Sequence, residues 1–244
     1  MKKLFMWTGD TPDFHLLSLE HIAGLMSLLA IYFIIVHKRE NIRSNQRLNT
    51  YLQVIAGALM IIQEIALNIW RYQMGLWSLA SSLPLHLCSL ALMIGPFLYI
   101  TKSQKLFDLL YYWSFGAFVA ILTPDIGTTG FPSFRYYQFF LSHGLILFQV
   151  IYMMTVLGMR PSTKSLKTTL IYTNIIMLTI GMINFMVGGN YFFIARKPET
   201  ASFMDLLGPW PVYIIFMELI AWGIFMLMYL PFRRRNVAKS SVDV

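Results

Sequence analysis

The sequence predicts an all-α membrane protein, a bundle of seven transmembrane helices. Of its 244 residues, 57% are hydrophobic and only 12% are charged, whereas about 25% of the residues in a soluble domain are charged. The chain also holds seven apolar runs, each close to the ~20 residues that a helix needs to cross ~30 Å of hydrocarbon. A chain this apolar cannot hide all its side chains inside one globule, so we expect lipid to solvate much of its surface.

The seven apolar runs are expected to be helices because, in lipid, backbone polar groups must be paired within the segment. No linker or internal repeat divides the chain, which predicts a single integral membrane domain over residues 1–244. The predicted spans are residues 18–37, 50–71, 83–100, 106–123, 136–158, 168–187 and 210–230.

The basic residues predict the orientation of the bundle. Thirteen Lys and Arg residues fall in the C-terminal tail and the connections on its side, and six fall on the opposite side. Because cytoplasmic loops carry the excess of Lys and Arg, the N-terminus is expected outside and the C-terminus in the cytoplasm. This placement accounts for the net charge of +8 without nucleic acid as a partner. The oligomeric state stays open, and no cofactor is expected.

Five side chains that can carry chemistry fall in the outer half of the predicted spans. They are Glu64, His86, Cys88, His143 and Glu218. Ionisable groups inside a membrane are costly and are functional candidates by default. Because these five come from different helices but share one depth, they predict a polar pocket that opens toward the outer leaflet.

The second span places three polar residues on one helical face. Glu64, Asn68 and Arg71 recur at i, i+4 and i+7, and such positions lie above one another. Arg71 could hold a phosphate group through charge-assisted hydrogen bonds. An internal Glu64–Arg71 ion pair that only stabilises the bundle is the structural alternative.

Cys88 is the only cysteine of the chain and the candidate nucleophile. A thiol attacks only as the thiolate, so it needs a nearby base, which His143 on another helix could supply. A Cys–His dyad suits acyl transfer, and Asn68, His86 or Asn190 could donate hydrogen bonds to the oxyanion. In the structural alternatives Cys88 is a small packing residue and His143 links two helices. Zinc is a further alternative, since Cys, His and Glu are all zinc ligands.

The longest connection, roughly residues 188–208, precedes the last span. Connections of this length are often lids or binding loops. It contains Asn190 and Tyr191, which we include among the supporting or substrate-binding candidates, and Glu218 follows in the last span.

Several motifs resemble those of one family. They are LPLHLC at 83–88, the His143 span, GGNYFF at 188–193, KPE at 197–199 with Ser202 and Asp205, and LGPWPVY at 207–213. Together they look like the YwaF family of bacterial integral membrane proteins, over roughly Leu16 to Pro231. That family is similar to a eukaryotic phospholipid acyltransferase in which a membrane Cys and a membrane His are implicated.

The resemblance implies a multi-pass protein of the bacterial cell membrane, with Cys88 and His143 at the matching positions. It favours an acyltransferase or acyl hydrolase that acts on phospholipid or lysophospholipid through a thioester on Cys88, with membrane lipids as the substrate. The alternative is a proton- or anion-coupled small-solute transporter. In a third reading the chain is a non-catalytic assembly or sensor protein.

Overall fold

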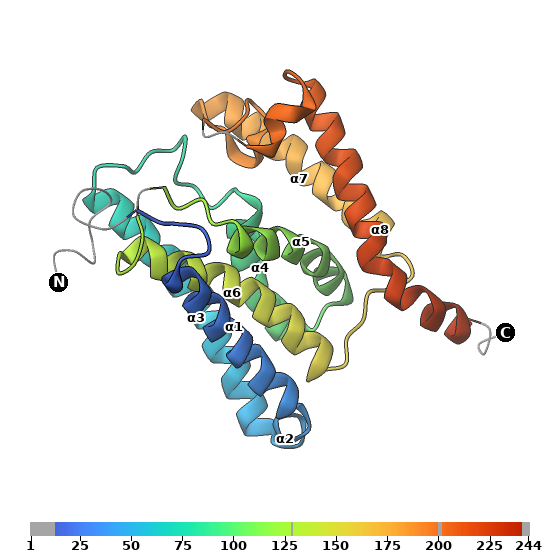
Figure 1. The fold of residues 1–244 in the computed structure, drawn as a ribbon. Helices are drawn as coiled ribbons and strands as arrows, with labels where there is room; N and C mark the ends of the chain where they lie inside the picture. The colour runs from blue at the N-terminus through green and yellow to red at the C-terminus, as the bar shows by residue number, and fades with distance from the viewer. Residues whose placement is uncertain (1–12, 128, 200–201, 241–244) are drawn as a thin grey trace. The chain divides into compact units, whose positions relative to one another are not determined.

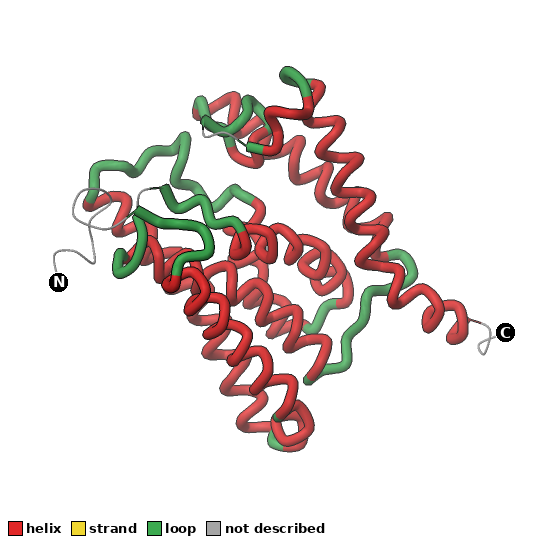
Figure 2. Tube along the Cα trace, in the orientation of Figure 1, coloured by secondary structure: helices red, strands yellow, loops and turns green. Residues whose placement is uncertain are grey.

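The computed structural model describes residues 13–127, 129–199 and 202–240, with side chains up to Arg233. Within these ranges the chain forms eight α-helices and no strand (Figures 1 and 2). The helices are α1 (Leu19–His37), α2 (Arg39–Ser44), α3 (Gln46–Gln73), α4 (Leu87–Thr101), α5 (Gln104–Leu122), α6 (Phe134–Thr155), α7 (Ser165–Val187) and α8 (Val212–Ser240). Two 3₁₀ turns, η2 (Tyr191–Phe193) and η3 (Phe203–Leu207), lie between α7 and α8.

Six of the described helices are long and apolar enough to cross a membrane, which identifies a multi-pass membrane protein. The predicted span over residues 83–100 differs, because α4 has only 15 residues. Residues 83–86 form a turn instead of helix, closed by a hydrogen bond from the Leu85 N–H to the Leu83 carbonyl (2.8 Å). Seven spans are therefore not confirmed. The orientation of the termini stays a prediction.

Local sequence fixes the start of most long helices. The residue before the helix offers a side-chain oxygen to a backbone N–H of the first turn, which satisfies one of the unpaired donors there. The pairs are Ser18 with His21, Asn45 with Leu48, Ser103 with Leu106 and Ser133 with Tyr136. At its C-terminus, α7 ends at Gly188. The φ of Gly188 is 66°, a left-handed conformation that favours glycine.

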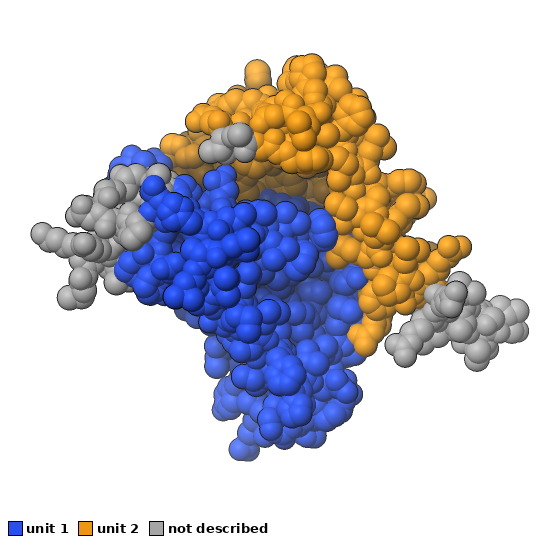
Figure 3. All heavy atoms as spheres, in the orientation of Figure 1, with its two compact units in different colours: residues 1–77, 87–159 blue, residues 78–86, 160–244 orange. Residues whose placement is uncertain are grey.

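The chain forms two compact units (Figure 3). Unit 1 takes the residues up to Trp77 together with Leu87–Met159, and unit 2 takes Ser78–His86 together with the residues from Arg160 onward. Unit 1 therefore contains α1 to α6, and unit 2 contains α7, α8 and the two 3₁₀ turns. Each unit is described by itself below.

The core of unit 1 lies where α3, α4 and α6 meet. A Cβ added at Gly95 of α4 would lie 2.5 Å from both the Met60 Sδ of α3 and the Gln149 Oε1 of α6. Only glycine permits this close approach of three helices. α1 joins the bundle through Tyr32, whose hydroxyl donates to the Gly144 carbonyl of α6 (2.9 Å).

In unit 2, α7 and α8 run side by side (Figure 1), and the segment that joins them is held by its own hydrogen bonds. The Asn184 amide binds both the N–H and the carbonyl of Tyr191, at 2.8 and 2.9 Å. The Tyr191 hydroxyl accepts from the Leu83 N–H (2.9 Å) and donates to the Leu79 carbonyl (2.8 Å). Tyr191 thereby fastens residues 78–86 into unit 2.

Candidate functional site

The site in unit 1 lies where one end of α3 meets the beginning of α6. The Trp70 and Phe134 rings lie 5.8 Å apart between centroids. One to two turns further along, the Gln138 side chain donates to the Gln63 Oε1 (2.8 Å). The two helices therefore run antiparallel, and their polar residues meet at one end of the unit.

Glu64 lies within this polar region and is only 5% exposed. The Gln63 amide donates to its carboxylate (3.4 Å), and the carboxylate acts electrostatically on both Cys88 and Arg135. The predicted structural alternative, an ion pair between Glu64 and Arg71, stays a prediction.

Arg135 is a candidate that the sequence analysis missed. Its guanidinium donates to the Gln138 side chain and lies over the Phe139 ring at 5.4 Å. It also acts electrostatically on His143 and Arg71. Arg135 lies just before the predicted span 136–158. In the sequence it therefore contributed only to the count of basic residues that predicts the orientation. Its i+3 spacing to Gln138 was the available signal.

The imidazole of His143 has a defined tautomer. Its Nδ1 lies 2.8 Å from the Phe139 carbonyl, and because a carbonyl only accepts, Nδ1 carries the proton. The ring also packs against the Phe139 ring, tilted by 33° with 4.2 Å between centroids. The other ring nitrogen, Nε2, is thereby the proton acceptor, which is the state that a general base requires.

Cys88 lies in the first turn of α4, since that helix begins at Leu87. The predicted span over residues 83–100 would instead place it further inside a helix. The backbone N–H groups of a first helical turn have no partner within the helix, so they can donate hydrogen bonds to a bound group.

The register of α4 against α6 relates Cys88 to His143. Gly95 of α4 lies against Gln149 of α6, and the Tyr99 ring of α4 lies 6.3 Å from the Tyr152 ring of α6. If the same register continues toward the N-termini of both helices, Cys88 is expected at the level of Ser142, the residue before His143. Side chains of α6 lean toward its N-terminus, which is the end where Cys88 lies.

Asn68 is already engaged in local structure. Its Nδ2 donates to the Glu64 carbonyl (3.0 Å) and its Oδ1 accepts from the Trp77 indole (3.0 Å). These contacts fasten the chain that follows α3 back onto the helix.

The remaining predicted residues belong to unit 2. His86 packs against the rings of Tyr191 and Phe193, at 5.2 and 5.4 Å between centroids. The Asn190 Oδ1 accepts from the N–H groups of Ala195 and Arg196, at 3.2 and 3.0 Å. These contacts hold the segment between α7 and α8 in shape.

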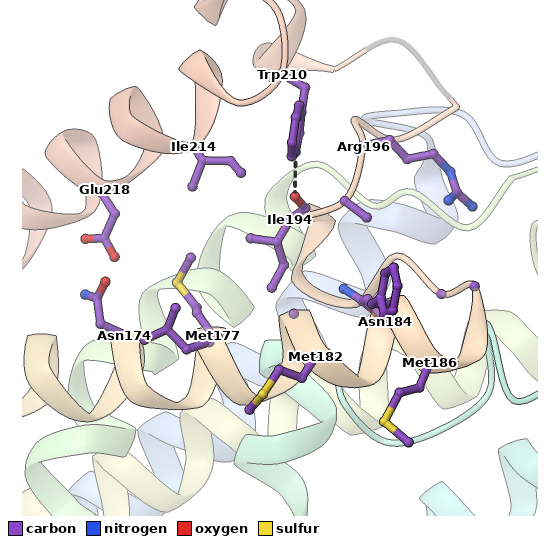
Figure 4. A pocket seen from close by; sticks show the side chains of 16 residues that line it. Asn174, Met177, Met182, Asn184, Met186, Ile194, Arg196, Trp210, Ile214 and Glu218 are labelled. Carbon is purple, nitrogen blue, oxygen red and sulfur yellow. Dashed lines mark hydrogen bonds between the residues drawn. The ribbon is translucent and has the colours of Figure 1, made fainter.

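Glu218 of α8 faces Asn174 of α7 in a groove of about 950 Å³ (Figure 4). Glu218 therefore lies in unit 2, with α7 and α8, while Glu64, Cys88 and His143 lie in unit 1. No three His, Cys, Asp or Glu side chains gather as a metal site anywhere in the part of the chain that the structure describes. Nothing in that part therefore favours the zinc alternative.

A model of the TMEM164 family matches residues 16–229, nearly the whole membrane-embedded chain. The chain belongs to the TMEM164 family. The predicted resemblance to the YwaF family is therefore wrong, because the match over this length is to TMEM164. The markers behind the prediction, LPLHLC and LGPWPVY, lie inside the matched residues and did not discriminate between families.

A curated relative is also similar. An uncharacterized protein of Treponema pallidum (strain Nichols) is 30% identical over 189 residues, which cover 78% of each chain. No solved structure matches the chain. The family assignment is thus accompanied by a similar bacterial protein, but by no similar solved structure.

Proposed function

We propose that this TMEM164-family protein transfers acyl chains of phospholipid or lysophospholipid inside the bacterial cell membrane, through Cys88 and His143. The observation that supports the proposal is the parallel register of α4 against α6, with Gly95 against Gln149 and Tyr99 beside Tyr152; continued by seven residues, this register predicts Cys88 at the level of Ser142, the neighbour of His143. The proton on Nδ1 of His143, held by the Phe139 carbonyl, supports it further. Membrane lipids are the substrate.

The proposed acyl transfer takes place in two half-reactions, acylation of Cys88 and transfer of the acyl group to an acceptor. Nε2 of His143 takes the thiol proton, the sulfur attacks the ester carbonyl of a lipid, and the leaving alkoxide takes the proton back from the imidazolium. The product is a thioester on Cys88. An acceptor hydroxyl then gives its proton to His143 and attacks the thioester, and the departing thiolate is reprotonated. Water as the acceptor gives hydrolysis.

The beginning of α4 can stabilise the tetrahedral intermediate of both steps. Unpaired backbone N–H groups at a helix N-terminus are suitable donors to a developing oxyanion. Cys88 lies in that first turn, so nucleophile and donors come from the same short segment. This placement replaces Asn68 as an expected donor, since its Nδ2 donates to the Glu64 carbonyl; Asn190 belongs to unit 2.

The test uses the purified full chain in liposomes that contain a deuterated-acyl phospholipid and an unlabelled lysophospholipid. Mass spectrometry follows the deuterated chain to the lysophospholipid and to Cys88. We expect transfer by the native protein and a fall of at least ~10²-fold for Cys88→Ser and His143→Ala, the range for losing a nucleophile or base. Ser27→Ala, which removes an exposed hydroxyl that donates to the Ala23 carbonyl of α1, is the matched control and should stay within threefold. Native rates in both active-site variants would overturn the proposal.

One observation favours transport as the second candidate. Gln149 is 0% exposed, and neither atom of its amide makes a hydrogen bond to any described residue. An unpaired buried amide is costly and is expected on a path for a polar solute. If transport is the function, uptake into vesicles follows a pH gradient, falls for Gln149→Leu and is unchanged for Cys88→Ser.

A further inference from the structure

Unit 2 contains a groove that the proposed thiol chemistry does not use. It runs between α7 and α8 under the segment that joins them, and it has a volume of about 950 Å³. Small-molecule sites commonly measure ~300–1,000 Å³, so this groove has room for a ligand. Figure 4 shows Met177 and Met182 of α7 below it and Ile214 of α8 above it.

The middle of the groove is apolar and open. Met177, Met182, Ile194 and Ile214 line it, and methionine adapts its shape to flexible apolar ligands. Gly181 lies among them, and a Cβ added there would meet no heavy atom of the described residues within 4 Å. The space above Gly181 is thus free for a hydrocarbon chain.

The two ends of the groove carry opposite charges. Arg196 lies at the end formed by the connecting segment, and Glu218 lies at the other end, facing Asn174 (Figure 4). The connecting-segment end is fixed in place, because the Trp210 indole donates to the Ile194 carbonyl (2.9 Å). Tryptophan is typical of the membrane interface, where lipid headgroups lie. An anionic headgroup is therefore attracted to the Arg196 end and repelled from the Glu218 end.

The length of the groove suits an acyl chain. Its lining on α7 extends from Asn174 to Gly188, which is roughly 20 Å at ~1.5 Å per residue. A second hollow of about 340 Å³ shares Asn174 and Glu218 and continues toward Leu170 and Trp222. A long apolar path with a cation at one end matches an amphiphile with an anionic head.

We propose that this groove binds one acyl chain of an anionic phospholipid, with the phosphate at Arg196 and the chain running along α7 toward Asn174 and Glu218. Binding requires neither Cys88 nor His143. The proposal therefore stands apart from the acyl-transfer function, and Cys88→Ser should bind the lipid as the native chain does.

The test uses the full chain in phosphatidylcholine nanodiscs that contain a small fraction of phosphatidylglycerol with a diazirine in one acyl chain. After irradiation, mass spectrometry locates and quantifies the crosslinks. We expect crosslinks on the groove residues Met177, Met182 or Ile214. Gly181→Leu fills the open space and should lower their yield at least fivefold. Gly223→Leu is the matched control, because Gly223 also meets no described atom within 4 Å but does not line the groove.

The headgroup contact has its own variants. Arg196→Gln should reduce crosslinking of the phosphatidylglycerol probe to the level of a phosphatidylcholine probe, while Arg196→Lys keeps the preference. Lys167→Gln, which removes a positive charge near the start of α7, should leave the yield within twofold. Circular dichroism and size-exclusion profiles check that each variant is folded.

Three results would overturn the proposal. The first is equal crosslinking of Gly181→Leu and the native chain. The second is loss of the anionic preference in Lys167→Gln but not in Arg196→Gln. The third is crosslinking confined to residues outside the groove.

Discussion

Units 1 and 2 are both built from apolar helices, but they use them differently. In unit 1 the buried share of the most apolar stretch rises from 11% in α1 and 39% in α3 to 56% in α5 and 61% in α6, whereas in unit 2 it is 11% for both α7 and α8. Mean hydropathy runs opposite to burial, because the sparsely buried helices α1, α7 and α8 are more apolar than α5 and α6. Apolar composition therefore marks a membrane helix, while its polar residues show which face packs against protein.

The polar residues follow the same division. Gln63, Glu64, Gln138 and Gln149 are buried in unit 1, where they meet between helices. In unit 2 the side chains of Asn184, Asn190 and Tyr191 hydrogen-bond to backbone groups of the segment that joins α7 and α8 and of residues 78–86. Unit 1 is thus organised by its interior and unit 2 by the segment that joins α7 and α8.

The largest expected difference between the units comes from placing the same side chain at two glycines. Gly95→Leu forces atoms into the contact of α3, α4 and α6, where even a Cβ comes within 2.5 Å of Met60 and Gln149. Overpacking of this kind costs ~1–3 kcal/mol, and we expect the upper end of that range. Gly223→Leu on α8 meets open space and should change the unfolding midpoint little. Thermal unfolding in detergent measures both, and equal midpoints would contradict the comparison.

The order of unit 2 should depend on the Tyr191 hydroxyl. Tyr191→Phe leaves the Leu83 N–H and the Leu79 carbonyl without this partner, at a side chain that is 0% exposed. The expected loss is ~1–3 kcal/mol. Tyr172→Phe on α7 is the control, because the Tyr172 side chain is 36% exposed. Its free energy of unfolding should stay within ~0.5 kcal/mol of the native value. Urea denaturation and limited proteolysis of residues 78–86 check the result.

A polar residue in the core of unit 1 should be dispensable for stability. Gln149→Met keeps the length of the side chain and removes a buried amide that pairs with no described residue. Because an unpaired buried polar group costs ~1–3 kcal/mol, we expect this variant to be about 1 kcal/mol more stable. Unfolding in detergent gives the value. Destabilisation of that size would mean that the amide has a partner in the membrane.

The smallest expected effect concerns Lys102, between α4 and α5. Its ammonium donates to the Gln53 side chain and the Tyr99 carbonyl, and burial lowers the pKa of Lys102 from 10.5. The unfolded chain then holds more protons in the window below pH 10.5, so stability should rise as the pH rises through that window. Lys102→Gln should flatten this rise. An identical pH profile of the unfolding midpoint in both proteins would contradict the assignment.

The sequence by itself determined the membrane class and the position of six helices, because hydrocarbon demands long apolar helical segments whatever surrounds them. It also pointed to Cys88, His143 and Glu64, since polar groups in such segments stand out. Only the tertiary structure decided that residues 83–86 lie outside α4, because that turn is fixed by Tyr191 from far along the chain. The structure likewise placed Glu218 in unit 2 and added Arg135 to the candidates, since a shared depth along separate helices does not determine which helices pack together.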